Sequence, residues 1–234
     1  YEPRPEQLKM SLAVADVIEN GGHLMVEAGT GVGKSFAYLV PAILSAINLG
    51  LKVVVSTHTI SLQEQLMTKD LPFLRTVMPD EFTSVLVKGR SNYISLRRLA
   101  GAVRKADGLF PRVEEHEQLR EIDLWSRKTD DGSRSDLDFS PSGSVWDAVA
   151  SDHGNCLGKA CPRVKDCFYY AARRRVGSAN ILVVNHALFL SDLSVKAEGG
   201  SLLPDYDVAI FDEAHTLDDV AGEHLGLKIS NARV

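Results

Sequence analysis

Two short runs of residues carry side chains from which nucleotide chemistry can be built. The first is Glu27-Ala28-Gly29-Thr30-Gly31-Val32-Gly33-Lys34-Ser35, which follows an apolar run and precedes a helical pattern. Small residues let successive backbone N–H groups turn onto phosphate oxygens, and a helix N-terminus adds its positive dipole end. Lys34 is then expected to reach the β- and γ-phosphates of ATP, and the Ser35 hydroxyl to bind Mg²⁺. The pattern predicts a phosphate-binding loop, with Ala28 where the strict pattern has glycine.

The second run supplies acidic side chains at the end of a predicted buried strand. It reads Val208-Ala209-Ile210-Phe211-Asp212-Glu213-Ala214-His215. Asp212 is expected to hold Mg²⁺ through water, and Glu213 to orient and deprotonate the water that attacks ATP. His215 follows on the same turn, where it could link the γ-phosphate to another part of the protein. Taken separately, the first run could be a glycine-rich turn and the second a helix cap; together they indicate an ATP site.

Alternating strands and helices are needed to position these two runs. Residues 6–20 repeat apolar side chains at helical spacing. Five short runs rich in apolar and β-branched residues follow, at 23–27, 52–57, 83–87, 180–184 and 207–211. The segments between them are long enough for helices, so the pattern predicts an α/β fold with a parallel sheet.

Residues 89–178 interrupt this alternation. The segment is charged, contains all three cysteines and includes a run rich in Asp, Ser and Gly at 130–144. We therefore expect an α/β domain formed by residues 1–88 and 179–234, interrupted by a small, mostly helical insertion at 89–178 with a loop around 129–143.

The composition of the 234 residues is that of a globular protein, with 44% hydrophobic residues and a net charge of −5. No apolar run reaches the roughly 18 to 20 residues of a bilayer span, so neither a membrane segment nor a signal peptide is expected. An odd number of cysteines favours a reducing compartment, the cytoplasm. Because the sequence begins with Tyr1, we expect a piece of a longer chain.

Positive charge is concentrated in two stretches despite the acidic total. Residues 86–105 hold six basic side chains and no acid, and residues 156–177 carry a net charge of +5. Such runs are commonly solvated helix faces, but two of them flanking an acidic segment also suit a surface that binds nucleic acid phosphates.

The phosphate loop combined with Asp-Glu-Ala-His resembles superfamily 2 helicases. The resemblance implies a first RecA-like domain that closes on ATP with a second one, absent from this sequence, and moves along nucleic acid. It also implies that Gln7, spaced from Arg4 as R-x-x-Q, reads the adenine edge. On the sequence alone, these two are equally compatible with an ordinary helix start.

Two further runs resemble the DinG and XPD branch of that superfamily, and the match covers essentially the whole chain. They are Lys88-Gly89-Arg90-Ser91-Asn92-Tyr93 and Asn180-Ile181-Leu182-Val183-Val184-Asn185-His186. The resemblance implies a [4Fe–4S] cluster held by Cys156, Cys161, Cys167 and a first ligand two residues after the tyrosine. That position holds Ser95. Weak iron binding, a three-cysteine cluster, loss of the cluster and three structural thiols all remain open.

The resemblance also indicates which residues contact DNA and what the protein does. It implies that Thr57, His58, Thr59 and Gln63 hold the backbone of single-stranded DNA, although Thr59 or Ser61 would equally cap a helix. Aromatic side chains among the basic runs are candidates for stacking on bases, namely Tyr93, Phe168, Tyr169 and Tyr170. Half of them are expected to pack in the core instead, because Phe and Tyr supply much of the packing of any small domain.

The expected function is that of an ATP-dependent DNA helicase moving 5′ to 3′ on single-stranded DNA and at junctions, in repair or replication. Its expected cofactors are ATP, Mg²⁺ and the cluster. We expect the isolated piece to hydrolyse ATP poorly, because it lacks the second domain's arginine finger. A DNA-stimulated ATPase or translocase that does not separate strands is one alternative, and a nucleotide-switched DNA-binding module is another.

Overall fold

The computed structural model describes residues 4–29 and 31–224. The chain divides into two compact units, each of which is described by itself below. The first unit combines the residues up to 87 with those from 176 onward, and the second comprises residues 88–175. No helix in the described part of the chain is both long and apolar enough to cross a membrane.

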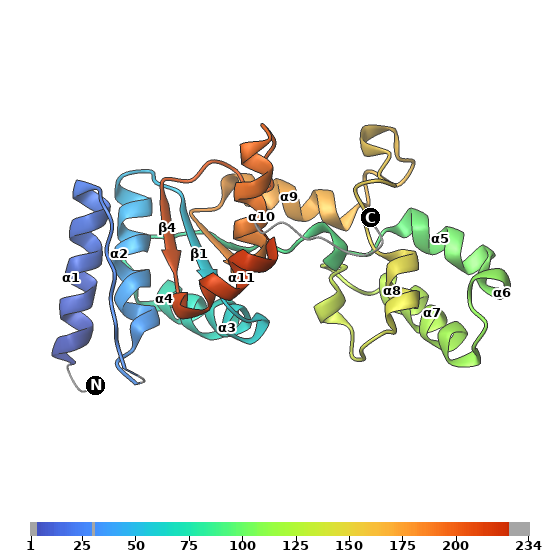
Figure 1. Cartoon of the computed structure of the whole chain (residues 1–234), viewed down its shortest axis with the longest axis horizontal. Helices are drawn as coiled ribbons and strands as arrows, with labels where there is room; N and C mark the ends of the chain where they lie inside the picture. Colours follow the sequence, from blue (N-terminus) through green and yellow to red (C-terminus); the bar gives the residue numbers. More distant parts are fainter. Residues whose placement is uncertain (1–3, 30, 225–234) are drawn as a thin grey trace. The chain divides into compact units, whose positions relative to one another are not determined.

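A parallel four-stranded sheet organises the first unit (Figure 1). Its strands are β1 (Val53–Thr57), β2 (Ser84–Leu86), β3 (Ile181–Asn185) and β4 (Val208–Phe211), in the order β2-β3-β1-β4. Val53 of β1 pairs with Ile181 on one side and Val208 on the other, so the carboxyl ends of these three strands lie at one edge. The predicted α/β fold with a parallel, RecA-like sheet is confirmed.

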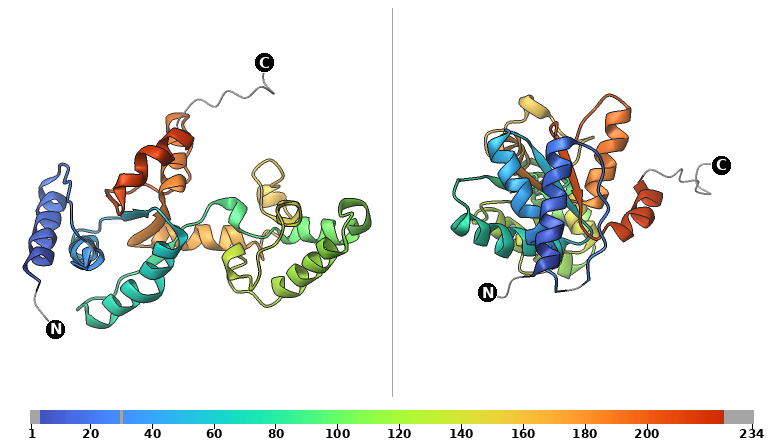
Figure 2. Two further views of the ribbon diagram at one scale, coloured as in Figure 1. Left: turned by 60° about the horizontal axis from the view of Figure 1, so that its bottom comes forward. Right: turned by 90° about the vertical axis from the view of Figure 1, so that its left-hand side faces the viewer.

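Helices supply the rest of the apolar core of this unit. They are α1 (Pro5–Asn20), α2 (Lys34–Asn48), α3 (Ile60–Gln65), α4 (Leu71–Val77), α10 (His186–Ala197) and α11 (Leu217–His224), with a π-helical segment at Leu66–Asp70. Leu39 and Ile43 on one face of α2 are fully buried against Val53 and Val55. The helix α1 lies alongside α2 (Figures 1 and 2). Burial of this helix face holds the start of α2 beside the sheet.

One expected strand is absent, because residues 23–27 form no strand and are exposed to solvent. Leu24 and Val26 are each more than two-fifths exposed, and Met25 is 98% exposed. The expectation of a strand at 23–27 is therefore wrong. An apolar composition favours a strand only where a neighbouring edge takes up its backbone hydrogen bonds, and tertiary context overrides that local preference here. The other four predicted strands are confirmed to within one residue at each end.

Helices dominate the second unit. They are α5 (Leu96–Arg104), α6 (Ala106–Leu109), α7 (Val113–Ser126) and α8 (Gly143–Val149), and α9 (Phe168–Ser178) begins there. The unit has its own core, in which Ile122, Val145 and Val149 are fully buried beside Trp146. Short 3₁₀ turns at Arg90–Asn92, Arg134–Asp136 and Gly158–Ala160 connect the helices. Residues 88–175 thus bury a hydrophobic cluster distinct from that of the first unit.

The separate core of the second unit can be tested on α7. Replacing fully buried Ile122 by alanine should lower the free energy of unfolding by about 2–5 kcal/mol, because the methyl groups it removes leave a cavity. Leu124 on the same helix is half exposed, so Leu124→Ala is the matched control and should cost less than about 1 kcal/mol. Urea denaturation measures both. Equal losses for the two variants would contradict this core.

Candidate nucleotide site and cysteine pocket

The predicted phosphate loop leads directly into α2, which begins at Lys34. Gly31 and Gly33 have φ angles of +81° and +84°, in the left-handed region that L side chains rarely adopt. A Cβ on Gly33 would lie 2.4 Å from Nε2 of Gln7. Glycine is therefore required at this position both for the turn and for the close approach of Gln7. Thr30 lies outside the described residues.

Arg4 and Gln7 both contact the backbone of this loop. The Arg4 guanidinium donates a hydrogen bond to the Gly31 carbonyl, and Gln7 Nε2 donates to the Gly33 carbonyl at 3.0 Å. Each side chain thus holds a carbonyl in place while the loop remains partly exposed at Ala28, Gly29, Val32 and Ser35. The R-x-x-Q spacing in the sequence corresponds to two contacts with the loop itself.

The acidic turn after β4 meets the phosphate loop through a salt bridge. Lys34 Nζ lies 3.2 Å from Glu213 Oε1, and His215 Nδ1 lies 3.4 Å from Glu213 Oε2. Glu213 has φ +56° and ψ +43°, and it is the only non-glycine residue with positive φ in the described ranges. Such a conformation costs on the order of 1 kcal/mol and commonly marks a functional turn. The structure brings the two sequence runs together.

Tyr38 is a residue of this site that the sequence analysis missed. Its hydroxyl donates a hydrogen bond to Asp212 Oδ2 at 3.0 Å, and its side chain is 2% exposed. Burial, followed by the negative charge of Asp212, holds the pKa of Tyr38 well above its usual value, so the phenol remains a donor at neutral pH. Tyr38 follows Lys34 by four residues, and this helical spacing, which places both on one face of α2, was the available signal.

The turn after β1 contains the residues expected to contact DNA, which differ in exposure. His58 and Thr59 are exposed, whereas Thr57 and Gln63 are buried. Thr59 caps α3, because its hydroxyl accepts a hydrogen bond from the Leu62 N–H at 3.2 Å. His58, Thr59 and the first turn of α3 are the parts of this segment open to a ligand.

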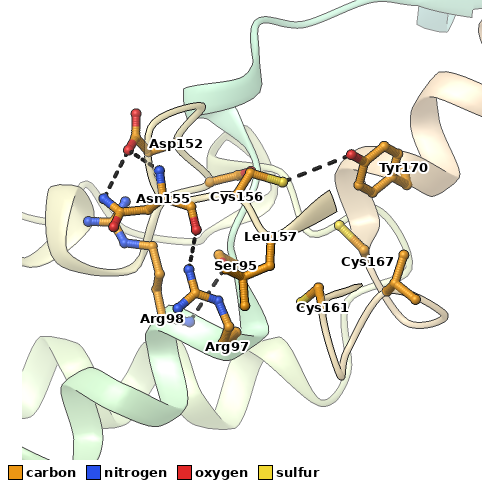
Figure 3. Close-up of a pocket in the computed structure, with 12 residues that line it drawn as sticks. Ser95, Arg97, Arg98, Asp152, Asn155, Cys156, Leu157, Cys161, Cys167 and Tyr170 are labelled. Carbon is orange, nitrogen blue, oxygen red and sulfur yellow. Dashed lines mark hydrogen bonds between the residues drawn. The ribbon is translucent and has the colours of Figure 1, made fainter. Parts of the chain in front are cut away.

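In the second unit, the three cysteines and Ser95 line a single pocket (Figure 3). None of the three thiols forms a disulfide. Cys156 accepts a hydrogen bond from the Gly158 N–H at 3.4 Å, and its sulfur lies 3.9 Å from the Tyr170 hydroxyl. The Gly158 N–H, followed by Arg90, lowers the pKa of Cys156 against the opposing effect of burial. The pocket thus gathers soft donors and favours the thiolate form of one of them.

These donors suit an iron–sulfur cluster at three positions. Cysteine sulfurs are the ordinary ligands of such clusters, and three cysteine side chains line the same pocket. Ser95 differs, since its oxygen is a harder donor and already accepts a hydrogen bond from the Arg98 N–H at 3.4 Å as the N-cap of α5. Within residues 4–29 and 31–224, no three His, Cys, Asp or Glu side chains lie close enough to hold a single metal ion. The three cysteines therefore share a pocket and have the right chemistry for a cluster, but their side chains are not arranged as a ready-made set of ligands.

Comparisons with known proteins match both units. A family described as DEAD/DEAH box helicase matches residues 9–105, and the DEAD_2 family matches residues 153–234. The chain is 41% identical to the ATP-dependent DNA helicase YoaA of Escherichia coli, over all of this chain and 36% of that protein. It is 38% identical to the ATP-dependent helicase DinG of Mycobacterium tuberculosis, over 92% of this chain and 34% of that protein.

A solved XPD helicase structure has the same fold, with a TM-score of 0.52 and 17% identity, over 95% of this chain and 34% of that one. The chain spans about a third of the length of the curated relatives named above.

The contact between Tyr38 and Asp212 can be tested by removing one atom, the hydroxyl oxygen of Tyr38. Tyr38→Phe keeps the ring in the core and removes the hydroxyl that orients the carboxylate. The affinity for Mg²⁺–ATP should fall about tenfold, or about 1.4 kcal/mol. Tyr206→Phe, at a partly buried tyrosine near Lys196 in the same unit, is the control and should leave affinity within about twofold. Titration calorimetry gives both values, and an unchanged affinity in Tyr38→Phe would remove this residue from the site.

Proposed function

Because the chain belongs to the DinG/XPD-like branch of superfamily 2 helicases, we propose that it is the ATP-hydrolysing RecA-like part of an ATP-dependent DNA helicase. The observation that carries this proposal is the junction of the phosphate loop with the acidic turn. Lys34 and Glu213 lie 179 positions apart in sequence yet form an ion pair, and Tyr38 orients the neighbouring Asp212. The junction gathers, at one place, side chains of the types that phosphoryl transfer to water uses, which supports the proposal.

Each side chain of the junction has a distinct role in the proposed hydrolysis. Lys34 would neutralise charge on the β- and γ-phosphates. Ser35 and Asp212 would hold Mg²⁺, which would neutralise further phosphate charge. Glu213 accepts a proton from the attacking water while the water oxygen bonds to the γ-phosphorus. The bond between that phosphorus and the leaving ADP oxygen breaks in the same step. His215 contacts Glu213 and holds its carboxylate from the other side.

DNA is the proposed nucleic acid substrate, in single-stranded form and at junctions. The names of the relatives in Escherichia coli and Mycobacterium tuberculosis support helicase activity, and that of the former also supports DNA. Exposed His58 and Thr59 would bind the DNA strand together with the N–H groups of α3. Thr57 and Gln63, which are buried, would hold these two residues in position. We propose movement from 5′ to 3′, a second RecA-like domain that completes the ATP site, and a role in repair or replication in the cytoplasm.

Residues 89–178 form the proposed iron–sulfur-type domain. Cys156, Cys161 and Cys167 would hold the cluster, and Ser95 would contribute no thiolate. Ser95 is also the specific observation that favours a second candidate function, a DNA-stimulated ATPase or translocase that does not separate strands. A purely nucleotide-switched binding module is less well supported, because such a protein has no need for Glu213.

The proposed general base can be tested in the full-length protein. Glu213→Gln removes the proton acceptor but keeps the size of the side chain, so ATP turnover should fall at least about 100-fold while ATP still binds. Glu198→Gln is the matched control, since Glu198 is exposed and lies outside the site. Steady-state phosphate release and nucleotide binding measure the two effects. Unchanged hydrolysis in Glu213→Gln would show that another group is the base.

Iron and acid-labile sulfide in anaerobically purified protein test the cysteine pocket. We expect about three to four irons per chain in the unaltered protein and a similar content in Ser95→Ala, because the three thiolates hold the cluster. Cys161→Ser should lose most of the iron. Ser95→Cys, which adds a fourth thiolate, should slow the loss of iron to a chelator. Absence of iron from the unaltered protein, with a full cluster in Ser95→Cys, would instead support the second candidate function.

A further inference from the structure

A histidine outside the proposed catalytic set lies fully buried beneath the ATP site. His186 is the first residue of α10, directly after β3, and its exposed fraction is 0%. The preceding residue, Asn185, caps α10 by accepting a hydrogen bond from the Leu188 N–H at 2.8 Å. The cap fixes the backbone at this position, so the imidazole ring is held at the edge where the parallel strands end.

One residue of β1 connects this ring to the catalytic turn. The Ser56 hydroxyl lies 2.7 Å from His186 Nδ1, and the Ser56 carbonyl accepts a hydrogen bond from the Asp212 N–H at 2.8 Å. In the sheet, Ser56 pairs with β3 on one side and with Phe211 on the other. Ser56 therefore contacts His186 through its side chain and the catalytic turn through its backbone.

The same ring also contacts the turn after β1 and the end of β4. Its centroid lies 6.1 Å from the ring of His58 and 6.1 Å from the ring of Phe211. His58 is the exposed residue proposed to meet the DNA strand, and Phe211 immediately precedes Asp212. A single buried side chain thus touches the ends of the three strands that carry the proposed DNA and ATP contacts.

A buried imidazole has a free-energy cost that an apolar side chain filling the same space would not have. Among the described residues, His186 Nε2 has no hydrogen-bond partner, and burying such a nitrogen costs about 1–3 kcal/mol. Burial lowers the pKa of His186, and so does the nearby His58. The backbone of Asp212 and Glu213 has the opposite, smaller effect on this pKa. The ring is therefore neutral and dipolar at neutral pH, whereas phenylalanine would fill the same space without this cost.

We propose that His186 is a positioning residue that links the DNA-contacting turn at His58 to the catalytic turn at Asp212 and Glu213. The link rests on the proposed function. A DNA strand that displaces His58 would push on the fully buried His186 ring beside it, and tightly packed interiors transmit such displacements. The Ser56 hydroxyl keeps the ring oriented, so the movement reaches the backbone of the Asp212–Glu213 turn. DNA binding would then raise the rate of ATP hydrolysis through His186.

The test compares ATP turnover of the full-length protein with and without a saturating thymidine oligonucleotide. His186→Phe keeps a ring of similar size and removes both nitrogens. The ratio of stimulated to unstimulated turnover should fall about tenfold, while the DNA concentration at half-saturation changes little and the melting temperature does not fall. Ser56→Ala should reduce the ratio in the same direction, and the double variant should lose no more than His186→Phe alone, since both remove one interaction. His186→Asn, whose side-chain amide lies near the position of Nδ1 and can still meet the Ser56 hydroxyl, should restore part of the ratio.

Phe189→Leu is the matched control, because Phe189 lies on the same helix and packs on Phe211 at 4.8 Å between centroids without reaching Ser56. Its ratio should stay within about twofold of the unaltered protein. Equal losses in Phe189→Leu and His186→Phe would overturn the proposal in favour of simple packing, as would an undiminished ratio in Ser56→Ala or in a folded His186→Phe. Absence of any DNA stimulation in the unaltered protein would overturn the proposed function as well.

Discussion

The parallel pairing of β1 with both β3 and β4 is the constraint on which the proposed site depends. Parallel strands end at one edge of a sheet, so the residues that follow them are gathered there regardless of their distance in sequence. Asp212 follows β4, His58 follows β1 and His186 follows β3. The ladder hydrogen bonds among buried Val, Ile and Leu residues hold this edge rigid, so ATP contacts and nucleic acid contacts can occupy neighbouring turns.

The edge also explains the strained backbone of Glu213. A left-handed conformation persists only where surrounding contacts determine it, and here both carboxylate oxygens have a cationic or imidazole partner. The Glu213 carbonyl accepts from Thr216, and the preceding N–H is held by Ser56. These contacts place the proposed base next to the phosphate loop. The packing of the strands that end here offsets the free-energy cost of the left-handed conformation of Glu213.

In the second unit, Ser95 caps a helix and would have to give up that role to bind the proposed cluster. A serine hydroxyl is a strong N-cap and a poor ligand for soft metals, whereas a thiolate has the opposite preferences. The structure shows Ser95 as the cap of α5, with its oxygen turned to the Arg98 N–H. The three cysteines nevertheless line the same pocket, with the 3₁₀ turn at Gly158–Ala160 lying between the first two of them.

The sequence by itself determined the fold class, four of the strands and the two runs of the proposed ATP site, because hydrophobic periodicity and glycine spacing are local signals. The strand expected at 23–27 is wrong, because whether an apolar run forms a strand depends on hydrogen bonding to a neighbouring strand. Tertiary structure alone showed that Tyr38 holds Asp212, that Gln7 and Arg4 contact the phosphate loop, and that His186 is buried between three strand ends. These contacts join residues from separate segments of the chain. Local spacing can mark a residue such as Tyr38 as a candidate, but only the register and packing of the sheet decide which partner it meets.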